Sequence, residues 1–115
     1  MCHNNCPNRK YTEQFATFQN YVRALHCPTR WVIIGLIDDK PTSTREIFEG
    51  LQTAGETLSK SGLYYHLQEL EKAGIIELAE YRETGGGAPE KVWRLSTKEI
   101  TISLTDLAEV PHEHD

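Results

Sequence analysis

Apolar side chains recur at helical spacing near the start of the chain. Five large ones follow one another at steps of four, three, four and three residues: Tyr11, Phe15, Phe18, Val22 and Leu25. This spacing places all five along one side of a helix. We therefore expect a helix over residues 11–26, with Thr12 as its N-cap and Pro28 preventing its continuation.

Two more helices are expected before the middle of the chain. The segment 28–39 begins with a proline, which a first helical turn tolerates, and contains an apolar block over residues 31–37. Such a block is typical of a buried helix or a buried strand, and its context favours a helix. The segment 43–54 begins with Ser43 and has Glu46 three positions later, which is the capping-box pattern of a helix N-terminus.

A fourth helix is expected over residues 59–73. Ser59 can cap its N-terminus, and Gly74 can end it. Three leucines form its apolar stripe: Leu63, Leu67 and Leu70. Two helices joined by a short glycine-containing turn form a helix-turn-helix pattern. His66 lies about 60° from the stripe on a helical wheel, so we expect it to be a partly buried structural histidine rather than a ligand.

Alternating apolar and polar residues follow this pair of helices. Residues 75–82 and 90–95 predict the two strands of a hairpin, although the alternation is interrupted near Ala79. The connection over residues 83–89 contains three glycines and forms the tip of the hairpin. A third strand is expected over residues 100–104, where isoleucine and leucine alternate with threonine and serine.

Length and charge narrow the class of protein. The 115 residues suffice for one small domain, and no apolar run approaches the roughly 20 residues of a membrane span. We see no signal peptide and expect a cytoplasmic protein. The net charge is −5, but residues 1–98 hold equal numbers of basic and acidic side chains, and the excess acids lie in residues 99–115. The body can therefore present a basic face, although net charge by itself gives DNA binding little support.

The end of the predicted fourth helix carries a motif made of His66, Leu67, Leu70, Gly74, Ile75 and Ile76. These residues follow His-Leu-x-x-Leu-x-x-x-Gly-Leu-Ile, and residues 58–77 thereby resemble the recognition helix of ArsR-like winged-helix regulators. The segment 87–95 looks like the second strand of a wing, and PadR-like regulators share a similar core. The resemblance covers residues 28–96. It implies a mainly α fold with a small β-hairpin wing, that is, a winged helix-turn-helix with an extra N-terminal helix.

The side of the fourth helix opposite the leucine stripe is polar and has few acids, which suits insertion into a DNA major groove. Gln68 can read adenine, and Lys60 near the helix N-terminus can meet a phosphate. A merely solvent-exposed side is the alternative, and two adjacent tyrosines favour binding. Basic side chains of the hairpin add further candidates. The expected DNA-binding residues are Ser59, Lys60, Ser61, Tyr64, Tyr65, Gln68, Lys72, Arg82, Lys91 and Arg94.

The predicted N-terminal helix is additional to the three helices of a winged helix, so its apolar side is free to pair with a second copy of the chain. DNA sites of such folds often reflect a two-fold dimer. We expect a homodimer, and packing of the stripe on its own domain is the alternative. The expected interface residues are Tyr11, Phe15, Phe18, Val22 and Leu25.

Cysteine and histidine residues lie in two short segments near the start of the chain. Three cysteines are too few for a secreted disulfide scaffold, which leaves them for metal or redox chemistry. A zinc site is one hypothesis, and its ligands would be Cys2, Cys6, His26 and Cys27. A free arm and a buried, unreactive cysteine are the alternative. The cysteine-rich motif of some ArsR-like metal sensors is absent, and no cofactor is required by the expected function.

We divide the chain into a flexible arm (1–10), an N-terminal dimerisation helix (11–27), a winged-helix DNA-binding domain (28–98), and a short strand with an acidic tail (99–115). We expect a sequence-specific transcription regulator that binds double-stranded DNA as a dimeric repressor. The alternatives are a winged-helix protein–protein interaction module of a transcription complex and a metal- or redox-responsive regulator. An enzyme is not expected, because no nucleophile–base set, phosphate loop or paired acid motif is visible.

Overall fold

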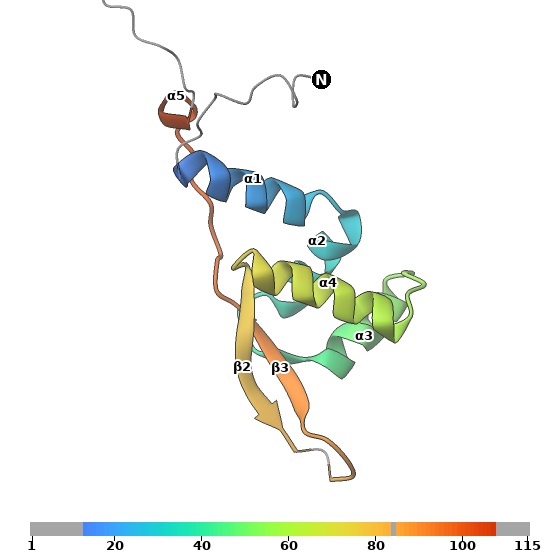
Figure 1. Ribbon diagram of the computed structural model, residues 1–115. Coiled ribbons are helices and arrows are strands. Elements are labelled where there is room, and N and C mark those ends of the chain that lie inside the picture. Colours follow the sequence, from blue (N-terminus) through green and yellow to red (C-terminus); the bar gives the residue numbers. More distant parts are fainter. Residues whose placement is uncertain (1–12, 84, 108–115) are drawn as a thin grey trace, which may run out of the picture.

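Five helices and three strands make up the described part of the protein, residues 13–83 and 85–107 of a computed structural model (Figure 1). The helices are α1 (Glu13–Leu25), α2 (Pro28–Ile37), α3 (Thr44–Thr53), α4 (Lys60–Lys72) and α5 (Leu104–Leu107). The strands are β1 (Thr42–Ser43), β2 (Ile76–Arg82) and β3 (Glu90–Leu95). This is the predicted mainly α fold with a small β-hairpin wing.

Local capping explains where the helices begin and end. The Ser43 hydroxyl accepts a hydrogen bond from the Glu46 backbone N–H at 3.1 Å, and the Glu46 carboxylate accepts one from the Ser43 N–H at 2.9 Å, which completes the predicted capping box. The hydrogen bonds from Ser43, first that of its backbone, lower the pKa of Glu46, although desolvation partly opposes them. Ser59 caps α4 by accepting from the Gly62 N–H at 3.0 Å. Gly74 follows α4 with a φ of 79°, a left-handed conformation that glycine adopts without steric cost.

The apolar sides of α2, α3 and α4 meet in one core. Its fully buried side chains include Ile33, Ile37, Ile47, Leu51, Leu63, Leu67 and Leu70. The predicted leucine stripe of the fourth helix is therefore confirmed. The apolar block 31–37 is helical, as expected, but it is not buried on all sides, because Trp31 at its start is 55% exposed.

The hairpin β2–β3 projects from the helices (Figure 1), with its two strands antiparallel. Leu78 pairs with Trp93 and Glu80 pairs with Val92, so Ala79 is an extra residue in β2. Such a bulge shifts the side chains after it to the opposite face of the strand. The interrupted alternation near Ala79 in the sequence therefore has a structural cause.

The third strand of the sheet is not the one that the sequence predicts. Residues 97–103 contain no strand, and the helix α5 follows them, so the strand expected over residues 100–104 is wrong. The third strand is β1, which pairs with β3 in a sheet of order β1-β3-β2. Residues 100–103, apolar and polar alike, line a hollow of about 500 Å³ beside α1 instead of joining the sheet.

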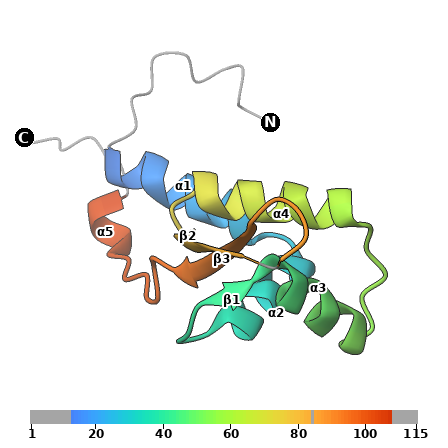
Figure 2. The same cartoon turned by 90° about the horizontal axis from the view of Figure 1, so that it is seen from below.

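The helix α1 packs against the domain with only part of its apolar side. Ala24 is buried and Leu25 is partly buried against the core, whereas Val22 is 47% exposed. In both views α5 lies beside the first turns of α1 (Figures 1 and 2). Tyr11 and the expected N-cap Thr12 lie outside the described residues. No helix in the described ranges is long and apolar enough to cross a membrane.

Candidate nucleic-acid interface

A groove of about 920 Å³ runs between α3, α4 and the part of the hairpin next to its tip. Its lining residues outside the core include Arg45, Phe48, Glu49 and Gln52 on α3, Lys60, Tyr64, Gln68 and Glu71 on α4, Pro89 in the tip, and Glu90 and Lys91 at the start of β3. Side chains from three elements thus converge on one concave surface. We call this surface the groove below.

The rotation of α4 decides which of its side chains reach the groove. Because the leucine stripe of α4 faces the core, the side chains on its two flanks face different neighbouring elements. Tyr64 lies on the groove side and is 58% exposed. Tyr65, the next residue, turns by about 100° along the helix and is not a groove residue, although it is 56% exposed.

Of the ten residues predicted to bind DNA, four line the groove: Lys60, Tyr64, Gln68 and Lys91. Ser59 and Ser61 lie at the N-terminus of α4, where their hydroxyl oxygens are 3.2 Å apart. Tyr65 and Lys72 lie on the exposed side of α4 outside the groove. Lys72 forms an ion pair with Glu69 at 3.3 Å. The structure therefore brings together three of the predicted residues of α4 and one basic residue of the hairpin.

The two arginines of the hairpin, also predicted to bind DNA, are held in ion pairs. Arg82 lies 3.8 Å from Glu46 and 3.6 Å from Glu80, and Arg94 lies 2.6 Å from Glu77. All of these side chains are partly exposed, and such pairs contribute little stability. They do neutralise both arginines locally, so a phosphate would have to compete with a carboxylate for either guanidinium.

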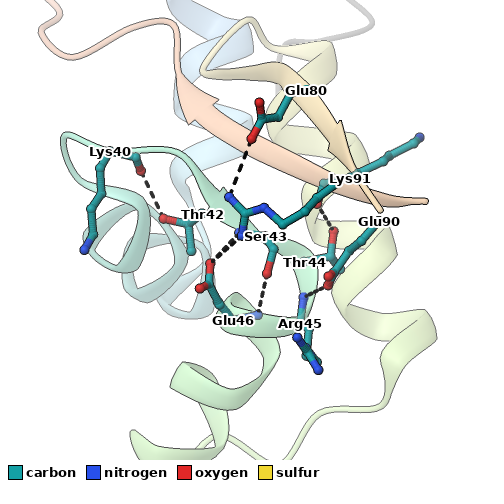
Figure 3. Close-up of polar contacts among 10 residues, drawn as sticks. Lys40, Thr42, Ser43, Thr44, Arg45, Glu46, Glu80, Glu90 and Lys91 are labelled. Atoms are coloured by element: carbon teal, nitrogen blue, oxygen red, sulfur yellow. Dashed lines mark hydrogen bonds and ion pairs between the residues drawn. The ribbon is translucent and has the colours of Figure 1, made fainter. Parts of the chain in front are cut away.

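Hydrogen bonds attach the start of β3 to the N-terminus of α3 (Figure 3). The Glu90 carboxylate accepts from the Arg45 backbone N–H at 2.6 Å, and the Thr44 hydroxyl donates to the Lys91 carbonyl at 3.1 Å. The buried indole N–H of Trp93 donates to the Thr44 hydroxyl at 3.0 Å. These contacts fix β3 against α3, and they thereby fix the position at which Lys91 enters the groove.

Two lysines of the groove lie over aromatic rings. The Lys60 ammonium is 5.9 Å from the centroid of the Phe48 ring, and the Lys91 ammonium is 5.7 Å from that of Trp93. An ammonium at this distance is attracted by the negative face of the ring. The rings therefore hold both positive charges on the groove, which lowers the entropy lost when they meet an anion.

The groove residues of α3 were not identified from the sequence. Arg45, Phe48 and Gln52 belong to it although the sequence reading placed no site there. The available signal was the capping box at Ser43, because it fixes the first turn of α3 and with it the position of Arg45. The crossing of α3 over α4, which brings these residues to the groove, is not encoded in either segment alone.

The charges in the groove are balanced. Three basic side chains, Arg45, Lys60 and Lys91, are accompanied by three acidic ones, Glu49, Glu71 and Glu90. Of the acids, Glu90 is engaged by the Arg45 backbone N–H. The predicted basic face is therefore a mixed surface on which lysines lie beside carboxylates and aromatic rings.

His66 is half-buried and hydrogen-bonded, as predicted for a structural histidine. Its Nδ1 accepts a hydrogen bond from Arg30 Nε at 3.0 Å. Burial and then the positive charge of Arg30 lower the pKa of the His66 imidazole, whereas Glu56 raises it. The imidazole is therefore neutral at physiological pH and points toward α2 rather than into the groove.

The expected zinc ligands are only partly within the described residues. Cys2 and Cys6 lie outside them, whereas His26 is exposed and Cys27 is a half-buried free thiol at the turn between α1 and α2. Within residues 13–83 and 85–107, no three histidine, cysteine or acidic side chains are grouped as metal ligands would be. The zinc site stays a prediction.

Comparison with known proteins shows a helix-turn-helix domain. Residues 24–79 match the protein family described as helix-turn-helix domain. No curated protein matches the chain. The ferric uptake regulator of Vibrio cholerae has a similar solved structure, with 21% identity and a TM-score of 0.52 over 70% of this chain and 64% of that chain. The ferric uptake regulator of Pseudomonas aeruginosa, solved with manganese, has 20% identity and a TM-score of 0.49 over 69% and 60%. The chain thus spans less than two thirds of the length of either regulator.

The family match extends from the end of α1 into β2 and therefore contains both helices of the helix-turn-helix, α3 and α4. The likeness to the Vibrio cholerae protein shows a shared fold. Together with the three-stranded sheet and its projecting hairpin, these findings confirm the expected fold. Residues 24–79 are thus similar to helix-turn-helix domains, and the fold of the described residues is a winged helix-turn-helix.

Proposed function

We propose that the groove binds duplex DNA, with α4 in the major groove, and that the protein is a sequence-specific, ArsR-like repressor acting as a homodimer. The observation that carries this proposal is the convergence of Lys60, Tyr64 and Gln68 on α4 with Lys91 of the wing on one concave surface. An α-helix with exposed polar side chains fits the width of a major groove.

The groove residues have different roles in recognition, according to their chemistry. Lys60 and Lys91 supply positive charge for phosphates, a contact that positions the protein without reading sequence. Gln68 carries the amide that pairs with the N6 and N7 atoms of adenine, and the exposed ring of Tyr64 can contact a thymine methyl group. Repression follows if the bound protein occludes the site from other DNA-binding proteins.

The proposed dimer uses the outer part of the α1 stripe. Val22 is 47% exposed and lies on the same helical side as Phe15 and Phe18, whose ring centroids are 6.4 Å apart. Leu25, also expected at the interface, is partly committed to the core of its own domain. The stripe is therefore shared between the domain and the proposed partner copy, and Phe15, Phe18 and Val22 carry the contact.

Binding to a pool of genomic DNA fragments at two salt concentrations tests this proposal. We expect fragments to be retained at 50 mM salt, to be lost steeply at 200 mM salt, and to share a sequence after selection. The variant K60A/Q68A/K91A should lose the selected fragment, whereas the control K40A, which removes an exposed lysine outside the groove, should retain it. Equal binding of both variants would refute the proposal.

The balanced charge of the groove favours a second candidate function, a protein-interaction module. Three carboxylates and three cations on the same surface as Phe48 and Tyr64 also suit a polypeptide with charged and apolar side chains. This candidate predicts a stable complex with a protein of the transcription apparatus and no salt-sensitive binding of DNA. Retention of a defined protein partner by the wild type but not by F48A/Y64A would support it.

A further inference from the structure

A buried arginine joins three elements of the fold. Arg30, in the first turn of α2, is only 7% exposed. Its Nη1 donates to the carbonyl oxygen of Ala24 in the last turn of α1 at 3.1 Å, and its Nε donates to His66 Nδ1 on α4 at 3.0 Å. Its guanidinium carbon lies 5.5 Å from the centroid of the Tyr65 ring. One side chain thus contacts the end of α1 and two consecutive residues of the recognition helix.

The partners of Arg30 are directional rather than ionic. Among the described residues, the ion pairs do not include Arg30. A buried guanidinium without a carboxylate depends on well-oriented acceptors, because its desolvation is costly. The planar fork of arginine can serve two acceptors in different directions and stack on a ring at once, which lysine cannot do. The arrangement therefore defines the separation of α1 and α4 as well as the position of the Tyr65 ring.

The neighbouring tryptophan strengthens the link to α1. Trp31 Nε1 donates to the carbonyl oxygen of Leu25 at 2.8 Å, so α2 side chains satisfy two successive carbonyls at the end of α1. These carbonyls lack partners within α1, as in the last turn of any helix. A displacement of α1 must therefore stretch the Arg30 contact to Ala24 or move Arg30 relative to α4.

We infer that Arg30 is a positioning residue that couples the C-terminal end of α1 to the recognition helix, and that it acts on DNA binding through Tyr65. This inference rests on the proposed function for its DNA readout. Tyr65 lies outside the groove but directly follows the groove residue Tyr64, and it is 56% exposed. Arg30 lies over its ring, and the exposed part of the side chain is available to DNA that extends beyond the groove. Because α1 is also the proposed dimer helix, the same Arg30 contact makes DNA affinity depend on how the two copies pair.

A double-mutant cycle on the full chain tests the coupling to DNA. Affinity for the selected fragment is measured for wild type, R30M, Y65L and R30M/Y65L. We expect each single variant to lose roughly three- to tenfold in affinity, and the double variant to lose no more than about twofold beyond Y65L. Losses that multiply would show that the two residues act independently and would overturn the inference. R23M is the matched control, because Arg23 is an exposed arginine of α1 whose side chain donates to Asn20 of the same helix, and it should bind as the wild type does.

Amide chemical shifts test the same coupling without DNA and therefore separate it from the proposed function. We expect Y65L to shift the amides of Ala24 and Leu25 in the wild-type background but not in the R30M background, because the contact between the helices passes through Arg30. Unchanged Ala24 and Leu25 amides in the wild-type background would overturn the inference even if DNA is bound. Wild-type protein that shows the coupling but binds no DNA would refute the proposed function alone.

If R30M does not fold, R30K replaces it in both experiments. Lysine keeps the buried charge and can reach one acceptor, but it cannot contact Ala24, His66 and Tyr65 together. We expect R30K to keep the fold and to lose the shift of Ala24 caused by Y65L. Full retention of that shift in R30K would show that charge alone links the helices and would overturn the positioning role of the guanidinium.

Discussion

Arg30 Nε donates a hydrogen bond to His66 Nδ1 across 3.0 Å, from the first turn of α2 to the middle of α4. An imidazole that accepts through Nδ1 carries its proton on Nε2. A second proton on Nδ1 would place an N–H opposite another N–H and a positive charge beside the guanidinium. The contact thus requires a neutral His66.

The stability of the protein should therefore decrease as the solution becomes acidic. Burial and Arg30 lower the pKa of folded His66 below its ordinary value of 6.5, more than Glu56 raises it. The unfolded chain then binds the proton more readily, so the free energy of unfolding is highest above pH 6.5 and falls as the pH drops through that value toward the folded pKa. Urea unfolding at pH 7.5 and pH 5.5 measures this decrease.

H66Q is the matched variant for this pH dependence. Its amide oxygen can accept from Arg30 and does not titrate. We expect the difference in unfolding free energy between pH 7.5 and pH 5.5 to be smaller in H66Q than in the wild type. The other histidines are present in both proteins, so their effect cancels. An equal difference in the two proteins would contradict the assignment to His66.

Two helical glycines should respond differently to alanine. A Cβ added at Gly35 in α2 meets nothing within 4 Å, so G35A should raise the free energy of unfolding by about 0.5–1 kcal/mol through helix propensity. A Cβ added at Gly50 in α3 would lie 2.7 Å from the Leu36 side chain, which must move. G50A should therefore be less stable than G35A in urea unfolding followed by circular dichroism. The same gain at both sites would show that Leu36 does not hold α3 closely against α2.

The helices could be predicted from the sequence because their signals are local. The Ser43–Glu46 capping box and the glycine after α4 lie within a few residues of the ends that they define. The strand β1 was missed because its two residues, Thr42 and Ser43, become a strand only by pairing with β3, about fifty positions later. The alternation over residues 100–104 misled because a local pattern does not reveal whether a segment pairs with another strand: residues 100–103, apolar and polar alike, line the hollow beside α1 instead.

The residues of the candidate site were also predictable only where local signals placed them. The polar side of α4 was predictable from the leucine stripe, and Lys60, Tyr64 and Gln68 do line the groove. Arg45 and the other α3 residues were missed because their position depends on how two helices cross. The helical wheel also grouped the adjacent tyrosines, whereas the structure directs Tyr65 toward Arg30.

The Thr44 hydroxyl should be important for the attachment of the hairpin. It accepts from the buried Trp93 indole at 3.0 Å and donates to the Lys91 carbonyl at 3.1 Å. T44V keeps the shape of the side chain but leaves the indole N–H without its acceptor, which should lower the free energy of unfolding by about 1–3 kcal/mol.

T42V is the control for T44V, because the hydroxyl of Thr42, which is itself buried, donates to the carbonyl of the exposed Lys40 at the turn before β1. Water can replace the hydroxyl as the donor to the Lys40 carbonyl. In urea unfolding, T42V should therefore lower the free energy of unfolding less than T44V does. Equal losses would mean that the indole finds another acceptor and that Thr44 does not hold β3 in place.

Variants at two lysines of α4 distinguish direct contact with DNA from a general effect of positive charge. Lys60 lies in the groove over Phe48, whereas Lys72 lies outside the groove and is paired with Glu69. Each phosphate contact contributes about one unit to the slope of the logarithm of affinity against the logarithm of salt concentration. K60A should therefore reduce the slope by about one, and K72A should leave it within experimental error. Fluorescence anisotropy with the selected fragment between 50 and 200 mM salt measures both slopes. A larger change of slope in K72A than in K60A would indicate that DNA binds on the other side of α4 and not in the groove.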